Sequence, residues 1–242
     1  MNDYDAESVE AHEHGAWEGA WSWENTTPEL EKQGHRVTAI DLPGSVGNQQ
    51  AIPEITMEGY VKTVADVITA LDHKVVLVGH SMAGAIISQV AERMPEKIER
   101  LVYVAAFLLK NGDSVLEAMQ RDPDGEYLPA LVFAEDQSYA MAPEAALRSI
   151  AFHDVDETSI QHALPRMAEK QATQPFMAKV AVSDERFGSV PKTYIRTTDD
   201  KITSPALQDE MVANWEVDTV HVLASGLFPA LSMPQELASS ML

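Results

Sequence analysis

The most informative motif for the fold is Val78-Gly79-His80-Ser81-Met82-Ala83-Gly84. It follows a short apolar run over residues 74–78 and precedes a helical pattern over residues 81–94, which Pro95 closes. A serine between small residues at a strand-to-helix turn is typical of a nucleophile elbow, in which a strained turn holds the serine Oγ above the edge of a sheet. We therefore interpret Ser81 as a candidate nucleophile, in preference to a simple helix N-cap.

Short β-branched runs alternate with amphipathic stretches on both sides of this turn, which is typical of parallel βαβ units. The predicted strands are residues 36–41, 74–78, 100–105, 192–196 and 219–223. Helices are predicted over residues 56–71 and 81–94, and from Ser204-Pro205, a cap followed by a proline, to about Trp215. The central runs are apolar on both faces, so we expect an α/β fold with a mostly parallel, doubly wound sheet.

Residues 108–188 interrupt this alternation. The segment is rich in Met, Ala and Pro, and it has helical periodicity without a convincing strand. Because about 80 residues are too many for a crossover connection, we expect a helical cap inserted before the penultimate strand. Such caps lie over the carboxyl edge of a sheet and enclose ligands. No repeat or linker divides the chain, so residues 1–242 are predicted to form a single domain.

Composition and charge exclude several classes of protein. Seventeen Lys and Arg against 38 Asp and Glu give a net charge of −21, which argues against nucleic acid or an anionic membrane surface as partner. No apolar run approaches the ~20 residues of a membrane helix, and the first five residues carry no basic group of a signal peptide, so we expect the cytoplasm. The absence of cysteine excludes disulfides, thiolate metal sites and cysteine nucleophiles.

Three stretches resemble the α/β-hydrolase superfamily, and within it the branch of plant methylesterases, hydroxynitrile lyases and bacterial esterases. They are Gly15-Ala-Trp-Glu-Gly-Ala-Trp-Ser-Trp23, Gly34-His-Arg-Val-Thr-Ala-Ile-Asp-Leu-Pro-Gly44 and Gly79-His-Ser-Met-Ala-Gly84. The likeness spans nearly the whole chain and includes residues 197–201 and 231–237. It implies an α/β-hydrolase fold, hydrolysis of a small carboxylic ester and no cofactor.

Carried over position by position, the resemblance implies roles for individual residues. The nucleophile falls on Ser81 and the acid of the catalytic triad on Asp200. The oxyanion donors fall on the backbone N–H groups of Ala16 and Met82. An apolar substrate pocket is expected, lined by Trp17, Met82, Leu227 and Phe228.

The chain departs from the family pattern around this pocket. Leu227 stands where the family has the triad histidine, and leucine cannot accept the Ser81 proton or return it to a leaving group. His80 flanks the serine but is expected to point away from it. Position 18, often histidine in relatives, is a glutamate, and the first strand reads Glu10-Ala-His-Glu13 in place of apolar residues. We therefore expect a poor esterase, or a hydrolase scaffold repurposed by divergence or engineering.

Three alternatives to an ester hydrolase stay open. Glu18 or Glu13, desolvated in an apolar pocket, is a candidate general base for abstraction of a carbon-bound proton. Glu10, His12 and His14 share one face of a strand and form a candidate metal site. The third alternative is a non-catalytic scaffold that binds a small apolar ligand. The simplest interpretation of Glu18 is a solvated loop residue. Whether residues 10–13 form a strand stays open, and so does the formation of a homodimer.

Overall fold

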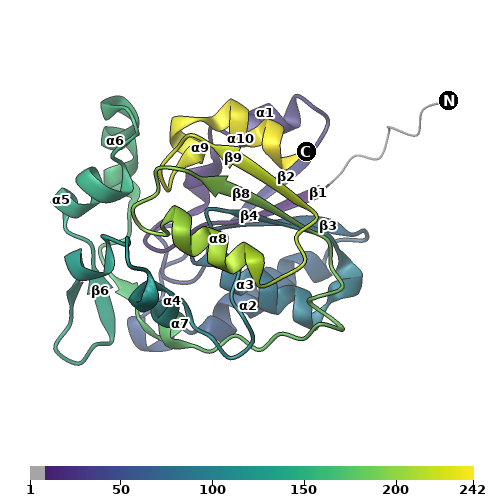
Figure 1. Cartoon of the computed structure of the whole chain (residues 1–242), viewed down its shortest axis with the longest axis horizontal. Helices are drawn as coiled ribbons and strands as arrows, with labels where there is room; N and C mark the ends of the chain where they lie inside the picture. The colour runs from purple at the N-terminus through teal and green to yellow at the C-terminus, as the bar shows by residue number, and fades with distance from the viewer. Residues whose placement is uncertain (1–8) are drawn as a thin grey trace.

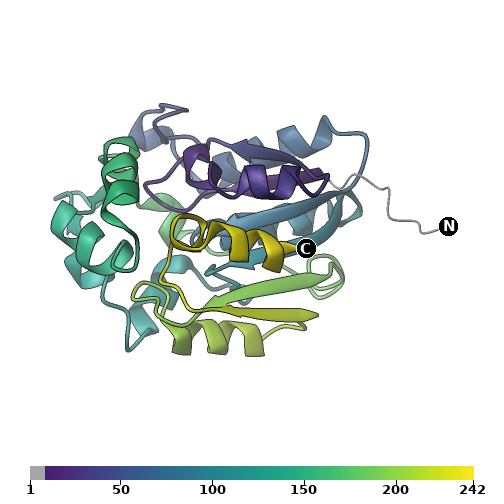
Figure 2. The same cartoon turned by 90° about the horizontal axis from the view of Figure 1, so that it is seen from above.

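A six-stranded parallel sheet forms the centre of the computed structural model, which describes residues 9–242 (Figures 1 and 2). Residues 1–8, which include the N-terminal stretch expected to lack a signal peptide, lie outside the described residues. The strands, in spatial order, are β2 (Arg36–Ile40), β1 (Val9–Glu13), β3 (Val75–His80), β4 (Ile98–Val104), β8 (Lys192–Thr197) and β9 (Thr219–Leu223). All five predicted strands are confirmed, and β1 forms as well although it contains two glutamates.

Helices cover both faces of this sheet, as the doubly wound pattern predicts (Figure 1). One face carries α2 (Met57–Thr69), α3 (Ala83–Arg93) and α8 (Pro205–Ala213), and the other carries α1 (Thr27–Glu31), α9 (Pro229–Ser232) and α10 (Pro234–Met241). Three short turns lie between strands and helices of this core: η1 (Ala20–Trp23) between β1 and α1, η2 (Ile52–Glu54) between β2 and α2, and η3 (Pro95–Lys97) between α3 and β4. Consecutive residues Leu77 and Val78 belong to separate buried clusters, one on each face of β3. None of the helices within residues 9–242 is long and apolar enough to cross a membrane.

Most of the segment between β4 and β8 lies beyond the carboxyl ends of the strands, at the left of Figure 1, and its last part returns past the end of α3 to the start of β8. Its helices and turns are α4 (Val115–Arg121), η4 (Leu128–Ala130), α5 (Glu144–Ala146), the π-helical η5 (Leu147–Ala151), α6 (Glu157–Ala163), η6 (Leu164–Arg166) and α7 (Gln174–Met177). It also contains an antiparallel sheet of β5 (Val132–Phe133), β6 (Tyr139–Met141) and β7 (Gln171–Ala172). The inserted segment is thus mainly helical, and the small sheet is an addition that the sequence did not reveal, because strands of two or three residues are too short to produce a visible alternation.

Candidate active site

Ser81 occupies the sharp turn between β3 and α3. Its backbone φ is +53°, a left-handed conformation that is strained for any residue with a side chain. The turn is held by two backbone hydrogen bonds: the Ser81 N–H donates to the Val104 carbonyl (3.2 Å), and the Ser81 carbonyl accepts from the Phe107 N–H (3.0 Å). Gly79 allows the close packing, since a Cβ there would lie 2.9 Å from the Ala83 carbonyl oxygen. The strand–turn–helix geometry that the motif predicts is therefore present.

Ser81 lines an apolar pocket under the cap. Trp17, Leu227 and Phe228, which the sequence analysis assigns to such a pocket, all lie in its wall. Cap residues that could not be specified from the sequence complete it, among them Leu147, Met167 and Phe176. Met82 is not among the lining residues, because its side chain is buried in the core beside the turn. The free space is about 20 Å³, room for about one water molecule.

The loop that carries Leu227 is tied to the turn that carries Asp200. The N–H of Asp199 donates to the Ser225 carbonyl at 3.0 Å, so the two segments run side by side beyond the ends of β8 and β9. The Leu227 side chain is buried and shares the pocket wall with Ser81. An apolar side chain therefore stands beside both the serine and the aspartate loop.

Asp154, a cap residue 71 positions before Ser225 in the sequence, also holds this loop. Its Oδ2 accepts from the Ser225 hydroxyl (3.0 Å) and from the Gly226 N–H (2.7 Å). A Cβ at Gly226 would lie 2.7 Å from Asp154 Oδ1, so the close approach needs the glycine. Sequence reasoning missed this contact because no local pattern links positions so far apart.

Asp200 is a buried carboxyl in the turn after β8. Its Oδ1 accepts from the Ile202 N–H (2.8 Å) and the Thr203 N–H (3.0 Å). Burial raises the pKa of Asp200 to about 7, although these two hydrogen bonds and the nearby His80 act in the opposite direction. The carboxyl is thus partly protonated at neutral pH.

The raised pKa of Asp200 predicts a pH dependence of stability. The folded state keeps this proton up to about pH 7, whereas the unfolded chain releases it near ~4, so stability falls by about 1.4 kcal/mol per pH unit in between. Asp200→Asn should remove that part of the slope, measured as the free energy of urea unfolding at several pH values from 4.5 to 7.5. The exposed neighbour provides a matched control, Asp199→Asn. If the free energy of unfolding falls equally with pH in all three proteins, the pKa of Asp200 is not raised in the folded state.

Glu18 is only 1% exposed and is paired with His80, so the reading of a solvated loop residue is wrong. Glu18 Oε1 lies 3.0 Å from His80 Nδ1, and His80 Nε2 lies 2.8 Å from the Leu227 carbonyl oxygen. Burial lowers the pKa of His80, but the Glu18 carboxylate, the Leu227 carbonyl and the nearby Asp200 together make the net shift upward. Both ring nitrogens face oxygen acceptors, which favours an imidazolium ring that donates at both ends.

Gly15 lies where Glu18, His80 and Ser81 meet. A Cβ at position 15 would lie 2.3 Å from Glu18 Oε1, 3.0 Å from Ser81 Cβ and 3.1 Å from His80 Nδ1. The missing side chain therefore lets a carboxylate, an imidazole and the serine come together. His80 was expected to point away from the serine; its ring is not among the residues that line the pocket, and it contacts the pocket residue Glu18.

Glu13 is the other candidate base, and it lies elsewhere. Its side chain is fully buried at the end of β1, and neither carboxylate oxygen has a hydrogen-bond partner within the described residues. Burial raises the pKa of Glu13 well above its ordinary value. Glu13 is not among the residues that line the Ser81 pocket, which leaves Glu18 as the carboxylate beside the serine.

The geometry does not support the candidate metal site. Glu10 and His12 do share a face, with 2.7 Å between Glu10 Oε2 and His12 Nε2. His14 is engaged separately: its Nε2 accepts from the Leu42 N–H at 3.0 Å, and its Nδ1 donates to the Gly15 carbonyl at 2.8 Å. No group of three or more His, Asp or Glu side chains within residues 9–242 is placed to hold a metal ion.

Comparisons with known proteins agree with this geometry. A family model described as "Alpha/beta hydrolase family" matches residues 13–240. Salicylic acid-binding protein 2 of Nicotiana tabacum is 32% identical, over 95% of this chain and 94% of that protein. Two chloroplastic proteins of Arabidopsis thaliana, named as methylesterases 11 and 15, are 32% and 31% identical, and the chain spans 60% and 53% of their lengths.

Solved structures give the same result. The pyrethroid hydrolase from Sphingobium faniae JZ-2 superimposes with a TM-score of 0.85 at 26% identity, covering 97% of this chain and 95% of that one. A mutant of polyneuridine aldehyde esterase superimposes with a TM-score of 0.84 at 25% identity, covering 97% of both chains. The chain belongs to the α/β hydrolase family, in its methylesterase-like branch.

Proposed function

We propose that the protein is a carboxylesterase-type hydrolase of small apolar esters, with Ser81 as nucleophile and with slow turnover because Leu227 replaces the proton-transferring histidine. The observation that carries this proposal is Ser81 at φ +53° in the wall of an apolar pocket that also contains Leu227. The names of the relatives, which include methylesterases and polyneuridine aldehyde esterase, support an ester as substrate.

In the proposed reaction, Ser81 Oγ adds to the ester carbonyl carbon, its proton passes to water, and negative charge develops on the carbonyl oxygen. The backbone N–H groups of Ala16 and Met82, together with the N-terminus of α3, would stabilise that charge. Ala16 lines the pocket and Met82 directly follows the serine. Both nitrogens of the nearby His80 ring are engaged, by Glu18 and by the Leu227 carbonyl, so proton transfer relies on water and the rate on oxyanion stabilisation and binding. Collapse of the intermediate breaks the ester C–O bond, the alkoxide takes a proton from water and leaves as the alcohol, and a second water molecule hydrolyses the acyl-serine to the acid.

A second candidate function rests on Glu18. Its carboxylate lies in the wall of the same pocket and is held by His80. A carboxylate in the same pocket as the proposed oxyanion donor Ala16 could remove a proton from the carbon next to a carbonyl, and the resulting enolate oxygen would receive hydrogen bonds from the Ala16 and Met82 amides. This proton transfer needs neither the Ser81 hydroxyl nor a triad histidine.

Two assays on the same variants separate these candidates. For ester hydrolysis, Ser81→Ala should lower kcat/KM for 4-nitrophenyl acetate at least ~10-fold and abolish any initial burst of nitrophenolate. For proton abstraction, Glu18→Gln should abolish deuterium uptake from D₂O by a small ketoester, while Ser81→Ala retains it. Glu31→Gln, at an exposed site on α1, is the matched control for the charge. If neither variant changes either readout, both candidates are wrong and a ligand-binding scaffold is left.

A further inference from the structure

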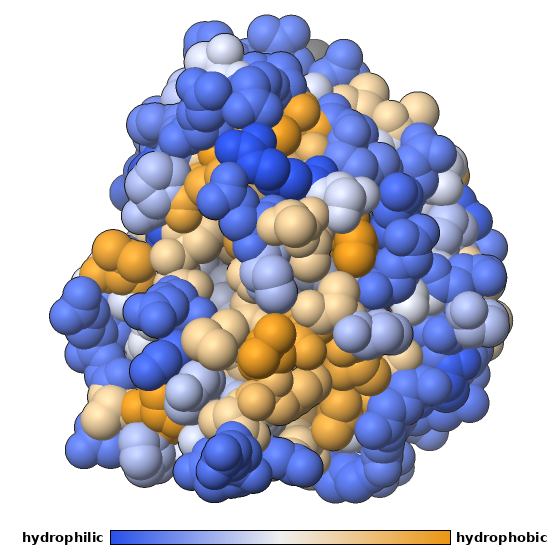
Figure 3. Space-filling model, turned by 90° about the vertical axis from the view of Figure 1, so that its left-hand side faces the viewer, coloured by the Kyte–Doolittle hydropathy of each residue, from blue (hydrophilic) through white to orange (hydrophobic). Residues whose placement is uncertain are grey.

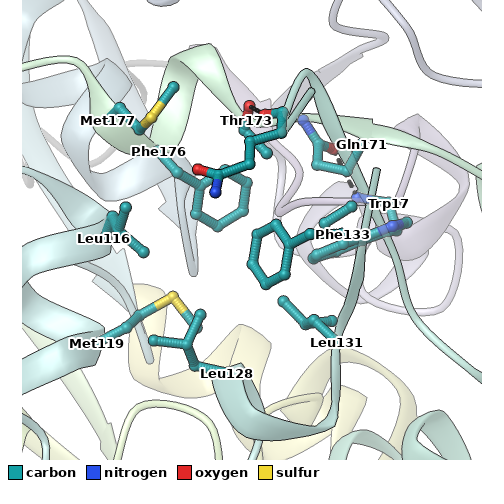
Figure 4. A pocket seen from close by; sticks show the side chains of 12 residues that line it. Trp17, Leu116, Met119, Leu128, Leu131, Phe133, Gln171, Thr173, Phe176 and Met177 are labelled. Atoms are coloured by element: carbon teal, nitrogen blue, oxygen red, sulfur yellow. Dashed lines mark hydrogen bonds between the residues drawn. The ribbon is translucent and has the colours of Figure 1, made fainter. Parts of the chain in front are cut away.

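A second cavity, shown in Figure 4, is lined mostly by cap residues and shares part of its wall with the Ser81 pocket. Trp17, Met119 and Phe176 line both cavities, whereas Ser81 and Leu227 line only the inner one. The free space of the outer cavity, about 50 Å³, exceeds the roughly 20 Å³ beside Ser81. The three shared side chains thus separate a narrow chamber at the serine from a wider one outside it.

The wall of the outer cavity is apolar and carries no charged side chain. Aliphatic and aromatic groups converge from α4, the η4 region, β5 and α7, namely Leu116, Leu128, Leu131, Phe133, Phe176 and Met177 (Figure 4). Two of the polar side chains in the wall are already engaged, whereas the indole N–H of Trp17 has no hydrogen-bond partner among the described residues. Gln171 accepts from the Trp17 N–H (3.0 Å) and donates to the Tyr60 hydroxyl (3.1 Å), and the Thr173 hydroxyl donates to the Gln137 carbonyl (2.5 Å). Such a wall is suited to an uncharged, apolar group.

Two large apolar side chains of this wall are exposed at the surface of the cap. Phe133 is 43% exposed and Met177 is 47% exposed. Figure 3, which shows the cap side of the molecule, displays a continuous apolar area on this face. Large exposed apolar residues that gather beside a cavity are typical of a binding site for an apolar ligand.

We propose that the outer cavity binds the larger apolar group of an ester whose carbonyl lies at Ser81. This proposal rests on the proposed ester substrate. The inner chamber has room for about one water molecule, so an alkyl chain or aromatic ring extends past Trp17 and Phe176 into the outer cavity. The net charge of −21 disfavours anionic ligands, which makes the uncharged ester the favoured occupant over the free acid.

The test compares the binding of methyl acetate and methyl hexanoate, by calorimetric titration, to the Ser81→Ala variant, in which turnover through Ser81 is absent. Each methylene that enters an apolar site strengthens binding by up to about 4-fold. We therefore expect methyl hexanoate to bind at least 10-fold more tightly than methyl acetate. Phe133→Asp, at the mouth of the cavity, should weaken hexanoate binding at least 10-fold.

Val132→Asp is the matched control, because Val132 is 48% exposed and precedes Phe133 in β5 but is not among the residues that line this cavity. It should leave hexanoate binding unchanged. Equal affinities for the two esters, or equal losses in the two aspartate variants, would overturn the proposal. Because binding is measured without turnover, tight hexanoate binding without any esterase activity would count against the proposed function alone.

Discussion

Leu227→His is expected to raise kcat/KM for 4-nitrophenyl acetate at least ~10³-fold, because removal of the triad histidine from a serine hydrolase lowers kcat by about 10⁶. The substituted ring would enter the pocket wall that Ser81 already shares. The loop that carries position 227 is held on two sides, by the backbone hydrogen bond from Asp199 to Ser225 and by the hydrogen bond from the Ser225 hydroxyl to Asp154. A histidine there could accept the Ser81 proton and be oriented by Asp200, the group that now lacks an imidazole partner.

Three further variants make this prediction specific. Leu227→Asn introduces a polar group of similar size without a base and should stay at the level of the unmodified protein. Combining Leu227→His with Ser81→Ala, or with Asp200→Asn, should abolish most of the gain. The restored rate should rise with pH through about 6.5, since only the neutral imidazole acts as a base. A gain that survives Ser81→Ala would mean that the new histidine acts on water and not through the serine.

Glu13→Leu is expected to stabilise the protein by about 2–4 kcal/mol at pH 8, an effect in the opposite direction to most core substitutions. The Glu13 carboxyl is fully buried without a hydrogen-bond partner among the described residues. Alternate residues of β1, Val9 and Ala11, belong to a hydrophobic cluster, so leucine adds an apolar side chain to an apolar face.

The stabilisation should depend on pH with a defined sign. Burial raises the pKa of Glu13, so the folded state keeps a proton that the unfolded chain releases above about pH 4.3. The stability of the unmodified protein therefore falls as pH rises above that value, and the gain from Glu13→Leu should be larger at pH 8 than at pH 5. Chemical unfolding at both pH values provides the measurement.

Glu10→Leu is the matched control on the opposite face of the same strand. Glu10 is also buried, but its carboxylate contacts His12 (2.7 Å) and His35 (3.0 Å). Its replacement should destabilise the protein, because the buried His12 would lose a hydrogen-bond partner. If Glu13→Leu also destabilises, or if its gain is the same at both pH values, the carboxyl is ionised and paired in the folded state and the interpretation is wrong.

The main elements of the fold could be predicted from local sequence patterns. Short β-branched runs mark five of the six strands of the central sheet, because strands buried on both faces are apolar at successive positions. A period of 3.6 residues marks the longer helices. The strands β5 and β7, with two residues each, leave no such trace. The elbow at Ser81 and the leucine at position 227 could also be identified, because a motif is read from neighbouring residues.

The α/β sheet, the serine turn and the leucine at the position where the family pattern predicts a histidine could thus be recognised from local patterns. The partners of each buried ionisable side chain, in contrast, became visible in the three-dimensional arrangement alone. Glu18 pairs with His80 across 62 positions and needs the space above Gly15, while Glu13 has no partner in the described residues. His14 bonds to the Leu42 backbone instead of joining a metal site. The state of a buried charged group depends on which distant groups the fold brings within hydrogen-bond distance, and no local pattern contains that information.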